Sequence, residues 1–279
     1  MALNLMYITN RPEIAQIAET AGVDRIFIDL EYIGKGERQG GMDTVQSRHT
    51  LEDVKRVSEA ITTAELLVRV NPIHEATDDY CSSEEEIDTA IKNGADILML
   101  PFFKTLAEAK RFISTVDKRA KTMLLIETPE AVEIIDDILQ LDGVDCIHIG
   151  LNDLSLGYGK KFMFELLSDG TVERLCAKIR EKGIPYGFGG IASLGKGMIP
   201  AEMIIKEHYR LGSTCAILSR SFCNVNKITH MGVISSTFVN GIRELREFEA
   251  ECEKYIGYFM NNKWELDKAI ASIADGDTK

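Results

Sequence analysis

The sequence lacks several features that mark special classes of protein. None of its apolar runs approaches the ~18 residues that a membrane-spanning helix needs. The first residues, MALNLMYITNRPE, contain no basic region followed by an apolar stretch and a cleavage site, so no signal peptide is predicted. The six cysteines are scattered and form no C-x-x-C pair. This favours reduced thiols in a cytoplasmic protein.

The chain also lacks an excess of positive charge. It has 32 Lys and Arg against 44 Asp and Glu, which gives a formal net charge of -12. Nucleic acid and anionic membrane surfaces repel such a chain, so neither is an expected partner. The charge does not define the substrate, because a local cationic pocket can lie within an acidic protein.

Eight short apolar runs alternate with stretches of helical periodicity. The predicted strands are residues 3–8, 25–30, 65–70, 96–101, 122–126, 145–149, 184–188 and 214–218. Strands and helices in strict alternation predict a parallel sheet, and eight strands are the number that closes a barrel. We therefore predict an α/β fold, a (β/α)8 TIM barrel with extra C-terminal helices. An open, doubly wound sheet is the alternative.

The predicted domain organisation is simple. No shift in composition and no linker divides the 279 residues, so residues 1–279 are predicted to form a single barrel domain. The loop at 33–49 and a helical extension at 233–279 are expected additions to the barrel. The extension is predicted to break near 261–262. Its amphipathic part, 241–260, suits packing in an oligomer or against its own barrel.

Two carboxylates follow neighbouring predicted strands. Glu127 ends the apolar run MLLI, and Asp153 has the equivalent place one repeat later. Barrels carry their chemistry at the carboxyl ends of their strands, and two such carboxylates suit a hard cation such as Mg²⁺. Alternatively, Glu127 forms an ion pair with Lys104 or Arg69, and Asp153 caps the helix that begins at Leu154.

Arg69 lies within the third predicted strand, between apolar residues. An inward-pointing arginine in this position needs an anionic partner. That partner is a substrate carboxylate or one of two acidic residues at the end of the second strand, Asp29 and Glu31. The sequence leaves these alternatives open.

The histidines and the last glycine cluster give weaker signals. His148, in CIHIG, is more typical of a hydrogen-bonded core histidine than of a base. His49, His74 and His230 have no supporting context. The glycine-rich segment 187–190 follows the predicted seventh strand, where barrels often bind phosphate, although tight packing is the commoner reason for such glycines.

One long segment resembles a known family. Residues 124–159, LLIETPEAVEIIDDILQLDGVDCIHIGLNDLSLGYG, resemble the HpcH/HpaI aldolase/citrate lyase family, in which I-E-T-x-x-A-V precedes G-V-D and then I-G-x-x-D-L-S. FIDLE at 27–31, VRVNP at 68–72 and GADILMLP at 94–101 occur in the order that the family has. The resemblance covers roughly residues 20–220.

The resemblance implies an active site. Mg²⁺ or Mn²⁺ would lie on Glu127 and Asp153, and Arg69 would stabilise the oxygen of an enolate. Backbone N–H groups of Leu151, Asn152 and Asp153 would hold a substrate carboxylate. The family is commonly oligomeric, so a homo-oligomer, a trimer or hexamer, is expected.

Three functions follow from the resemblance. The first is a metal-dependent carbon–carbon lyase that cleaves or forms 4-hydroxy-2-oxo acids through a pyruvate enolate. The second is an acyl-CoA lyase of the citrate lyase β or malyl-CoA lyase type, for which Lys35, Arg38 and Arg48 would provide basic residues. The third is a metal-binding barrel without turnover.

The chain departs from the family after the second strand. The aldolases carry a histidine after the acidic residue there, and this chain has Tyr32. The acyl-CoA branch has an acidic pair, which Tyr32 does not match either. The catalytic candidates in this segment are therefore Asp29, Glu31 and Tyr32. Tyrosine can act as acid or base only if its pKa is lowered or if it relays a proton.

Overall fold

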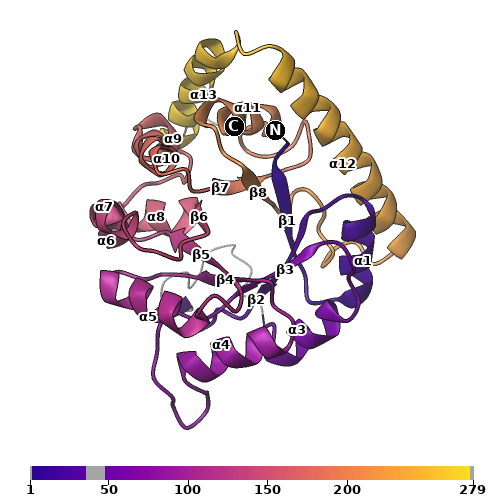
Figure 1. The fold of residues 1–279 in the computed structure, drawn as a ribbon. Helices are drawn as coiled ribbons and strands as arrows, with labels where there is room; N and C mark the ends of the chain where they lie inside the picture. Colours follow the sequence, from indigo (N-terminus) through magenta and orange to yellow (C-terminus); the bar gives the residue numbers. More distant parts are fainter. Residues whose placement is uncertain (1, 36–47, 277–279) are drawn as a thin grey trace.

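Eight parallel strands form a closed barrel in this computed structural model, which describes residues 2–35 and 48–276 (Figure 1). Each strand pairs with the next in the chain, and the last pairs with the first. The strands are β1 (Asn4–Ile8), β2 (Arg25–Asp29), β3 (Glu65–Arg69), β4 (Ile97–Leu100), β5 (Lys121–Ile126), β6 (Cys146–Ile149), β7 (Tyr186–Ile191) and β8 (Cys215–Leu218). The predicted (β/α)8 barrel is confirmed, and the open sheet is wrong.

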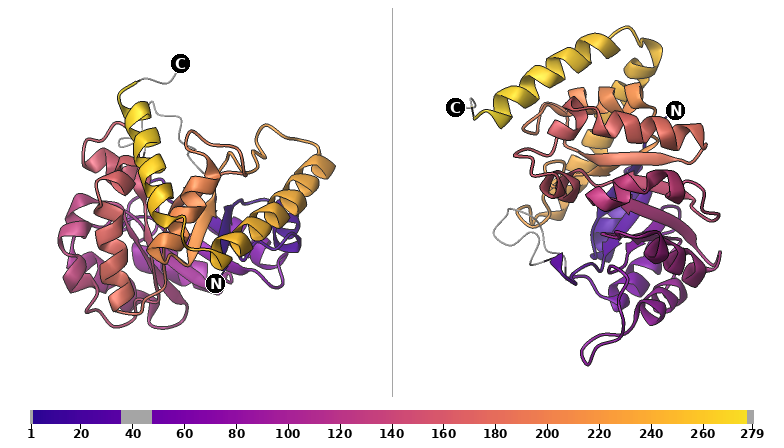
Figure 2. Two further views of the ribbon diagram at one scale, coloured as in Figure 1. Left: turned by 90° about the horizontal axis from the view of Figure 1, so that it is seen from above. Right: turned by 90° about the vertical axis from the view of Figure 1, so that its left-hand side faces the viewer.

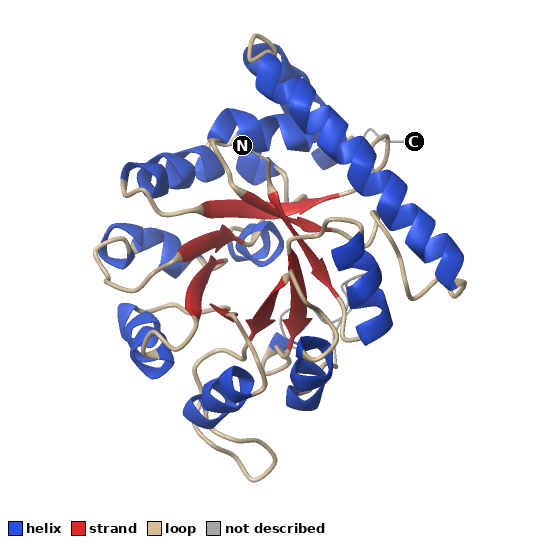
Figure 3. Cartoon of the chain, turned by 45° about the vertical axis from the view of Figure 1, so that its right-hand side comes forward, coloured by secondary structure: helices blue, strands red, loops and turns tan. Residues whose placement is uncertain are grey.

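Helices surround the barrel (Figure 3). They are α1 (Pro12–Thr20), α3 (Leu51–Ser58), α4 (Ser83–Lys92), α5 (Leu106–Val116), α6 (Pro129–Glu133), α7 (Ile135–Ile138), α8 (Leu151–Gly157), α9 (Glu165–Ser168), α10 (Thr171–Glu181), α11 (Ala201–Leu211), α12 (Met231–Lys254) and α13 (Phe259–Ala274). Within the described ranges, none of them has both the length and the apolarity needed to cross a membrane.

The starts of α3, α4 and α5 follow from local chemistry. At each, the hydroxyl of the N-cap residue accepts the N–H of the third helical residue, and the carboxylate of that residue accepts the N-cap N–H. The three pairs are Thr50 with Asp53, Ser82 with Glu85, and Thr105 with Glu108. These caps satisfy N–H groups that have no partner within the helix, so they fix where each helix begins.

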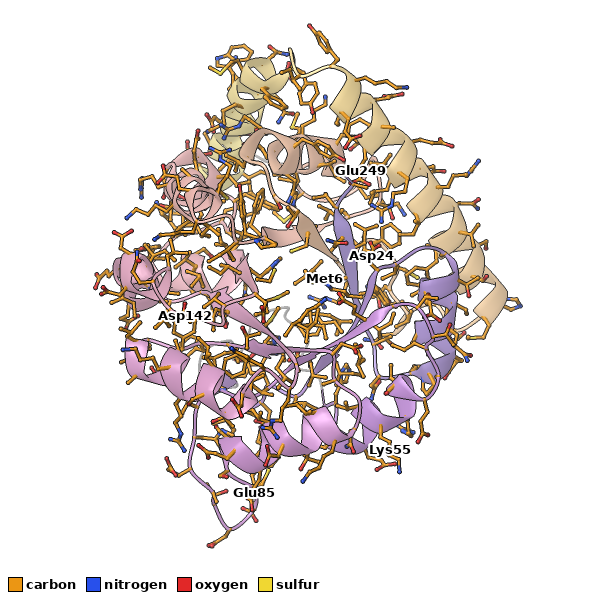
Figure 4. The ribbon with its side chains drawn as sticks, in the orientation of Figure 1. Met6, Asp24, Lys55, Glu85, Asp142 and Glu249 are labelled. Atoms are coloured by element: carbon orange, nitrogen blue, oxygen red, sulfur yellow. The ribbon has the colours of Figure 1, made fainter. Side chains whose placement is uncertain are left out.

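The barrel interior is filled with side chains. Met6 lies at its centre (Figure 4), together with Phe27, Leu67 and Met99, and all four are buried. A larger apolar layer lies between the strands and the helices. The packed interior leaves the ends of the strands as the place for a cavity.

The C-terminal helices lie on the outside of the barrel (Figure 2). α12 contacts α1 and α11, and α13 contacts α9 and α11. The predicted break at 261–262 was wrong, because α12 ends at Lys254 and α13 begins at Phe259. Asn262 lies inside α13, where its amide donates hydrogen bonds to Met203 O and Glu207 of α11. Tyr255 instead has extended backbone and ends α12.

β7 is longer than predicted, so the glycines expected after it lie within it. A Cβ on Gly187 would overlap the carbonyl oxygen of Cys215, and one on Gly190 would lie 3.1 Å from the carbonyl oxygen of Ile217. The register of β7 against β8 shifts between these two glycines. Close approach of the two strands therefore explains both residues.

Candidate functional site

A cavity of about 950 Å³ lies at the carboxyl ends of the strands. Both metal candidates, Glu127 and Asp153, line it, and so do Arg69, Leu151 and Asn152. In the sequence, these residues lie on or directly after three different strands, β3, β5 and β6. The barrel brings them to one cavity.

Glu127 follows β5 directly and is 4% exposed. Its Oε1 accepts a hydrogen bond from the N–H of Phe102 at 2.9 Å. Burial raises the pKa of Glu127 to about 8; the carboxylates of Glu31 and Asp153 add to this rise, and Arg69 opposes it. Burial near like charges favours the protonated form of a carboxyl group, and a bound cation would favour the ionised form instead.

Space for the Glu127 carboxylate depends on Gly150. This residue precedes α8 with an ordinary backbone conformation, φ -83°. A Cβ at this position would lie 2.8 Å from both Cβ and Oε2 of Glu127. Glycine therefore leaves the room that the carboxylate occupies.

Asp153 is the third residue of α8 and is 7% exposed. The residue at the N-cap position is Gly150, so the interpretation of Asp153 as a helix cap is wrong. Lys104 forms its ion pair with Glu130 at 3.0 Å, and the predicted alternative of a Lys104–Glu127 pair is not found in the described residues.

The donor set at Glu127 and Asp153 fits a hard divalent cation. In the described part of the chain, no group of three or more His, Cys, Asp and Glu side chains is placed to hold a metal. Two carboxylates leave most of the coordination sphere of such a cation to water and substrate oxygens, as is usual for Mg²⁺.

Arg69 is held by the two acidic residues at the end of β2. Its Nε and Nη2 donate to the two carboxylate oxygens of Asp29 at 2.8 and 2.9 Å. Its Nη2 also lies 3.3 Å from Glu31 Oε2. Lys35 Nζ completes the cluster, 2.9 Å from Asp29 and 3.4 Å from Glu31. Two bonds to one carboxylate fix the plane of the guanidinium.

The charges in this cluster are mutually stabilised. Burial opposes ionisation of Asp29, but Arg69 and Lys35 hold the pKa of that carboxyl well below its usual range. Burial likewise opposes the charge on Arg69, and Asp29 and Glu31 raise its pKa above the ordinary value. An Asp29 carboxylate with a pKa this low is a weak base, so its part is to position Arg69.

Tyr32 lies away from the cavity. It is 50% exposed, its ring meets that of Tyr80 edge to face at 5.2 Å, and it is not among the described residues that line the cavity. Burial raises the pKa of Tyr32, and the carboxylate of Glu86 raises it further. A catalytic base needs the opposite shift, so the geometry does not support the predicted catalytic role of Tyr32.

Two histidines line the cavity with different surroundings. His148 is buried, its Nε2 lies 3.1 Å from Gly189 O, and burial lowers its pKa to about 4. It is a hydrogen-bonded core histidine, as expected. His49 is half-buried, and its Nδ1 accepts a hydrogen bond from the N–H of Asp29. Its place was missed because it follows Asp29 by 20 residues and no motif marks it.

Comparisons with known proteins agree with this architecture. A family model described as HpcH/HpaI aldolase/citrate lyase matches residues 4–184. A curated relative, 4-hydroxy-4-methyl-2-oxoglutarate aldolase cghB of Chaetomium globosum, is 24% identical over 223 residues. That match covers 68% of this chain and 75% of the relative.

Solved structures share the fold at low sequence identity. An HpcH/HpaI aldolase from Desulfitobacterium hafniense superposes with a TM-score of 0.58 at 16% identity, covering 88% of this chain and 93% of that chain. A family protein from Burkholderia cenocepacia gives 0.59 at 15%, covering 88% and 95%. The citrate synthase SbnG gives 0.58 at 16%, covering 88% and 94%.

Proposed function

Because the chain belongs to the HpcH/HpaI aldolase/citrate lyase family, we propose that it is a divalent-metal-dependent carbon–carbon lyase acting on 4-hydroxy-2-oxo acids. The family and the aldolase relative make it an enzyme of the aldolase or lyase type. One observation carries the finer proposal. The buried pair Glu127 and Asp153 shares a cavity with Arg69, whose guanidinium is fixed by two hydrogen bonds.

In this proposal, Glu127 and Asp153 hold Mg²⁺ or Mn²⁺. When bound, the metal would supply positive charge beside the 2-oxo group of the substrate. The charge of two carboxylates balances that of a divalent cation, and such a cation would oppose the burial and the like charges that raise the pKa of Glu127. Arg69 and the backbone N–H groups at the start of α8 would then bind the enolate oxygen and the carboxylate of the substrate.

Arg69 stabilises the enolate in the proposed reaction. Cleavage removes the proton of the C4 hydroxyl, breaks the C3–C4 bond, and leaves the bonding electrons on the enolate of pyruvate. The guanidinium is held in place by Asp29 and Glu31 before charge develops, so little reorganisation is needed during the reaction. In this proposal the substrate carboxylate binds at the backbone N–H groups that begin α8, from Leu151 to Asp153.

The acyl-CoA alternative has less support. It needs cationic side chains that can reach the phosphates of CoA. Lys35 is 4% exposed and is engaged by Asp29 and Glu31, so it is not available for that role. Arg48 lines the cavity, and Arg38 lies outside the described residues.

Hydrogen exchange tests the proposal. Protein with Mg²⁺ in D2O is mixed with pyruvate or with acetyl-CoA, and NMR follows deuterium entering each methyl group. We expect exchange into pyruvate, abolished by EDTA and by Glu127→Ala, and retained in Tyr32→Phe.

The other outcomes separate the alternatives. Exchange into acetyl-CoA alone would overturn the proposal in favour of an acyl-CoA lyase. Magnesium binding without exchange on either compound would indicate a barrel that binds metal without this turnover.

A further inference from the structure

We propose that His49 is a catalytic residue whose Nε2–H donates a hydrogen bond to the oxygen on C4 of the substrate. This inference rests on the proposed lyase reaction. It assigns a hydrogen-bond donor to the C4 end of the substrate, which neither Arg69 nor a metal on Glu127 and Asp153 would contact. Nothing in the sequence around His49 predicts this role.

The proton position on His49 follows from one contact. The backbone N–H of Asp29 lies 3.0 Å from His49 Nδ1. A backbone N–H can only donate, so Nδ1 must accept, and the proton of a neutral imidazole is then on Nε2. No described residue forms a hydrogen bond with Nε2, and His49 lines the cavity.

The charges around His49 favour the neutral ring. Burial lowers its pKa, and the cations Lys35 and Arg69 lower it further. The carboxylates of Asp29 and Asp53 act in the opposite direction and do not reverse the shift. The ring also lies just before the N-terminus of α3, where the helix dipole disfavours a positive charge.

Asp29 positions two groups at once. Its carboxylate fixes the guanidinium of Arg69, and its backbone N–H fixes the imidazole of His49. The two donors therefore have a fixed relation at the end of β2. In the proposed reaction Arg69 stabilises the enolate, and His49 donates a hydrogen bond to the fragment that leaves.

A neutral imidazole held in this way is a donor and not a base. Nδ1 is occupied by the amide, and Nε2 already carries its proton. In cleavage the C4 hydroxyl loses its proton to solvent, the C3–C4 electron pair passes to the pyruvate enolate, and C4–O becomes a carbonyl. His49 neither gains nor loses a proton. It stabilises the negative charge that develops on this oxygen.

Two substitutions separate catalysis from structure. In His49→Asn, the side-chain oxygen can still accept from the Asp29 amide near the place of Nδ1, but no donor reaches the place of Nε2. In His49→Gln, the longer amide can place a donor near Nε2. If His49 did no more than accept the Asp29 hydrogen bond, which asparagine can also accept, His49→Asn would cleave the substrate like the wild type.

The experiment compares two reactions of each variant loaded with Mg²⁺. Cleavage is measured with 4-hydroxy-2-oxoglutarate and its 4-methyl derivative, and enolisation is measured as deuterium exchange into pyruvate. Pyruvate has no oxygen at C4, so His49 has no partner in the exchange reaction. For His49→Asn we expect cleavage to fall about 10²- to 10³-fold and exchange to stay within about 3-fold. His49→Gln should recover part of the cleavage.

Several results would overturn the proposal. Cleavage by His49→Asn within about 3-fold of wild type would remove any catalytic role, and an equal loss of cleavage and exchange would indicate a structural or basic one. Nitrogen-15 NMR of the five histidines, with His49→Asn as the assignment standard, should show Nε2–H and unprotonated Nδ1 at pH 7. The other tautomer or an imidazolium would contradict it. If the wild type itself neither cleaves nor exchanges, the proposed function fails first.

Discussion

Glu127 illustrates how the charge of one side chain opposes folding in the absence of metal. Its pKa, raised to about 8 by burial and by neighbouring carboxylates, lies above the ordinary value of 4.5. A group whose folded pKa is raised stabilises the protein below its unfolded pKa, and this contribution is lost as pH rises through the folded pKa. The apo protein should therefore lose stability between about pH 4.5 and pH 8 from this residue.

We expect Glu127→Gln to stabilise the metal-free protein. Glutamine keeps the acceptor for the Phe102 N–H and removes the buried charge. Urea denaturation in EDTA should show a gain of roughly 0.5–2 kcal/mol in the free energy of unfolding at pH 8.5, and a smaller gain at pH 6. Glu130→Gln, at a residue of α6 whose side chain is 46% exposed, should change stability by less than about 0.5 kcal/mol. A loss of stability in Glu127→Gln at pH 8.5 would contradict the argument.

Gly150→Ala should weaken metal binding without backbone strain. Its backbone conformation suits alanine, but the added Cβ would lie 2.8 Å from the Glu127 carboxylate, which must move. We expect a loss of 1–3 kcal/mol in stability, about the usual cost of overpacking, and a Mg²⁺ Kd raised at least about tenfold by calorimetry. Gly159→Ala is the control. There φ is +65° and the space is open, so stability should fall and the Kd should not change.

At the scale of elements, strands were easier to predict than helix ends. Each strand is a short apolar run between polar turns, and all eight occur. The predicted break at 261–262 is wrong because the side-chain amide of Asn262 finds its hydrogen-bond partners in α11 and the helix continues through it. Contacts between α13 and α11 determine where the C-terminal helices end, and these contacts cannot be read from a single sequence.

In the candidate site, too, some residues could be predicted from the sequence and others could not. For Arg69 the sequence left a substrate carboxylate, Asp29 and Glu31 as alternative partners, and the structure pairs it with Asp29 and Glu31. The role of His49 could not be predicted, because the sequence does not show that His49 lies beside the backbone of Asp29. Tyr32 is a candidate by its place after Asp29 and Glu31 in the sequence, but it is not among the described residues that line the cavity.

Glu249 should anchor α12 to the barrel. Its carboxylate accepts from the Leu3 N–H at 2.8 Å, from Tyr209 Oη at 3.1 Å and from Arg246 at 2.7 Å. Figure 4 shows it near the start of β1. Glu249→Ala removes the acceptor of the buried Leu3 N–H and one partner each of Tyr209 and Arg246, so thermal or urea unfolding should reveal a loss of about 1–3 kcal/mol. Glu247→Ala, at an exposed residue of the same helix, should change stability little. Equal effects of the two substitutions would reject the anchor.

At the scale of the whole molecule, Mg²⁺ should act as a stabiliser. A ligand that binds only the folded state at 100 times its Kd adds about 2.7 kcal/mol to the free energy of unfolding. We expect this gain for the wild type and its loss in Asp153→Asn, measured by urea denaturation with and without Mg²⁺. Sodium at matched ionic strength controls for general screening of the net charge of -12. The same gain in the variant would argue against a metal site on Asp153.

The pairing of β1 with β8 has a consequence for synthesis on the ribosome. Each other strand can pair with the strand made just before it, but β1 must wait for β8, and the Leu3 N–H waits for a carboxylate 246 residues away. Until Cys215–Leu218 emerges, the growing sheet has two open edges. Open edges are templates for pairing with other chains. The nascent protein is therefore most exposed to mispairing late in its synthesis, and closing the barrel ends that period.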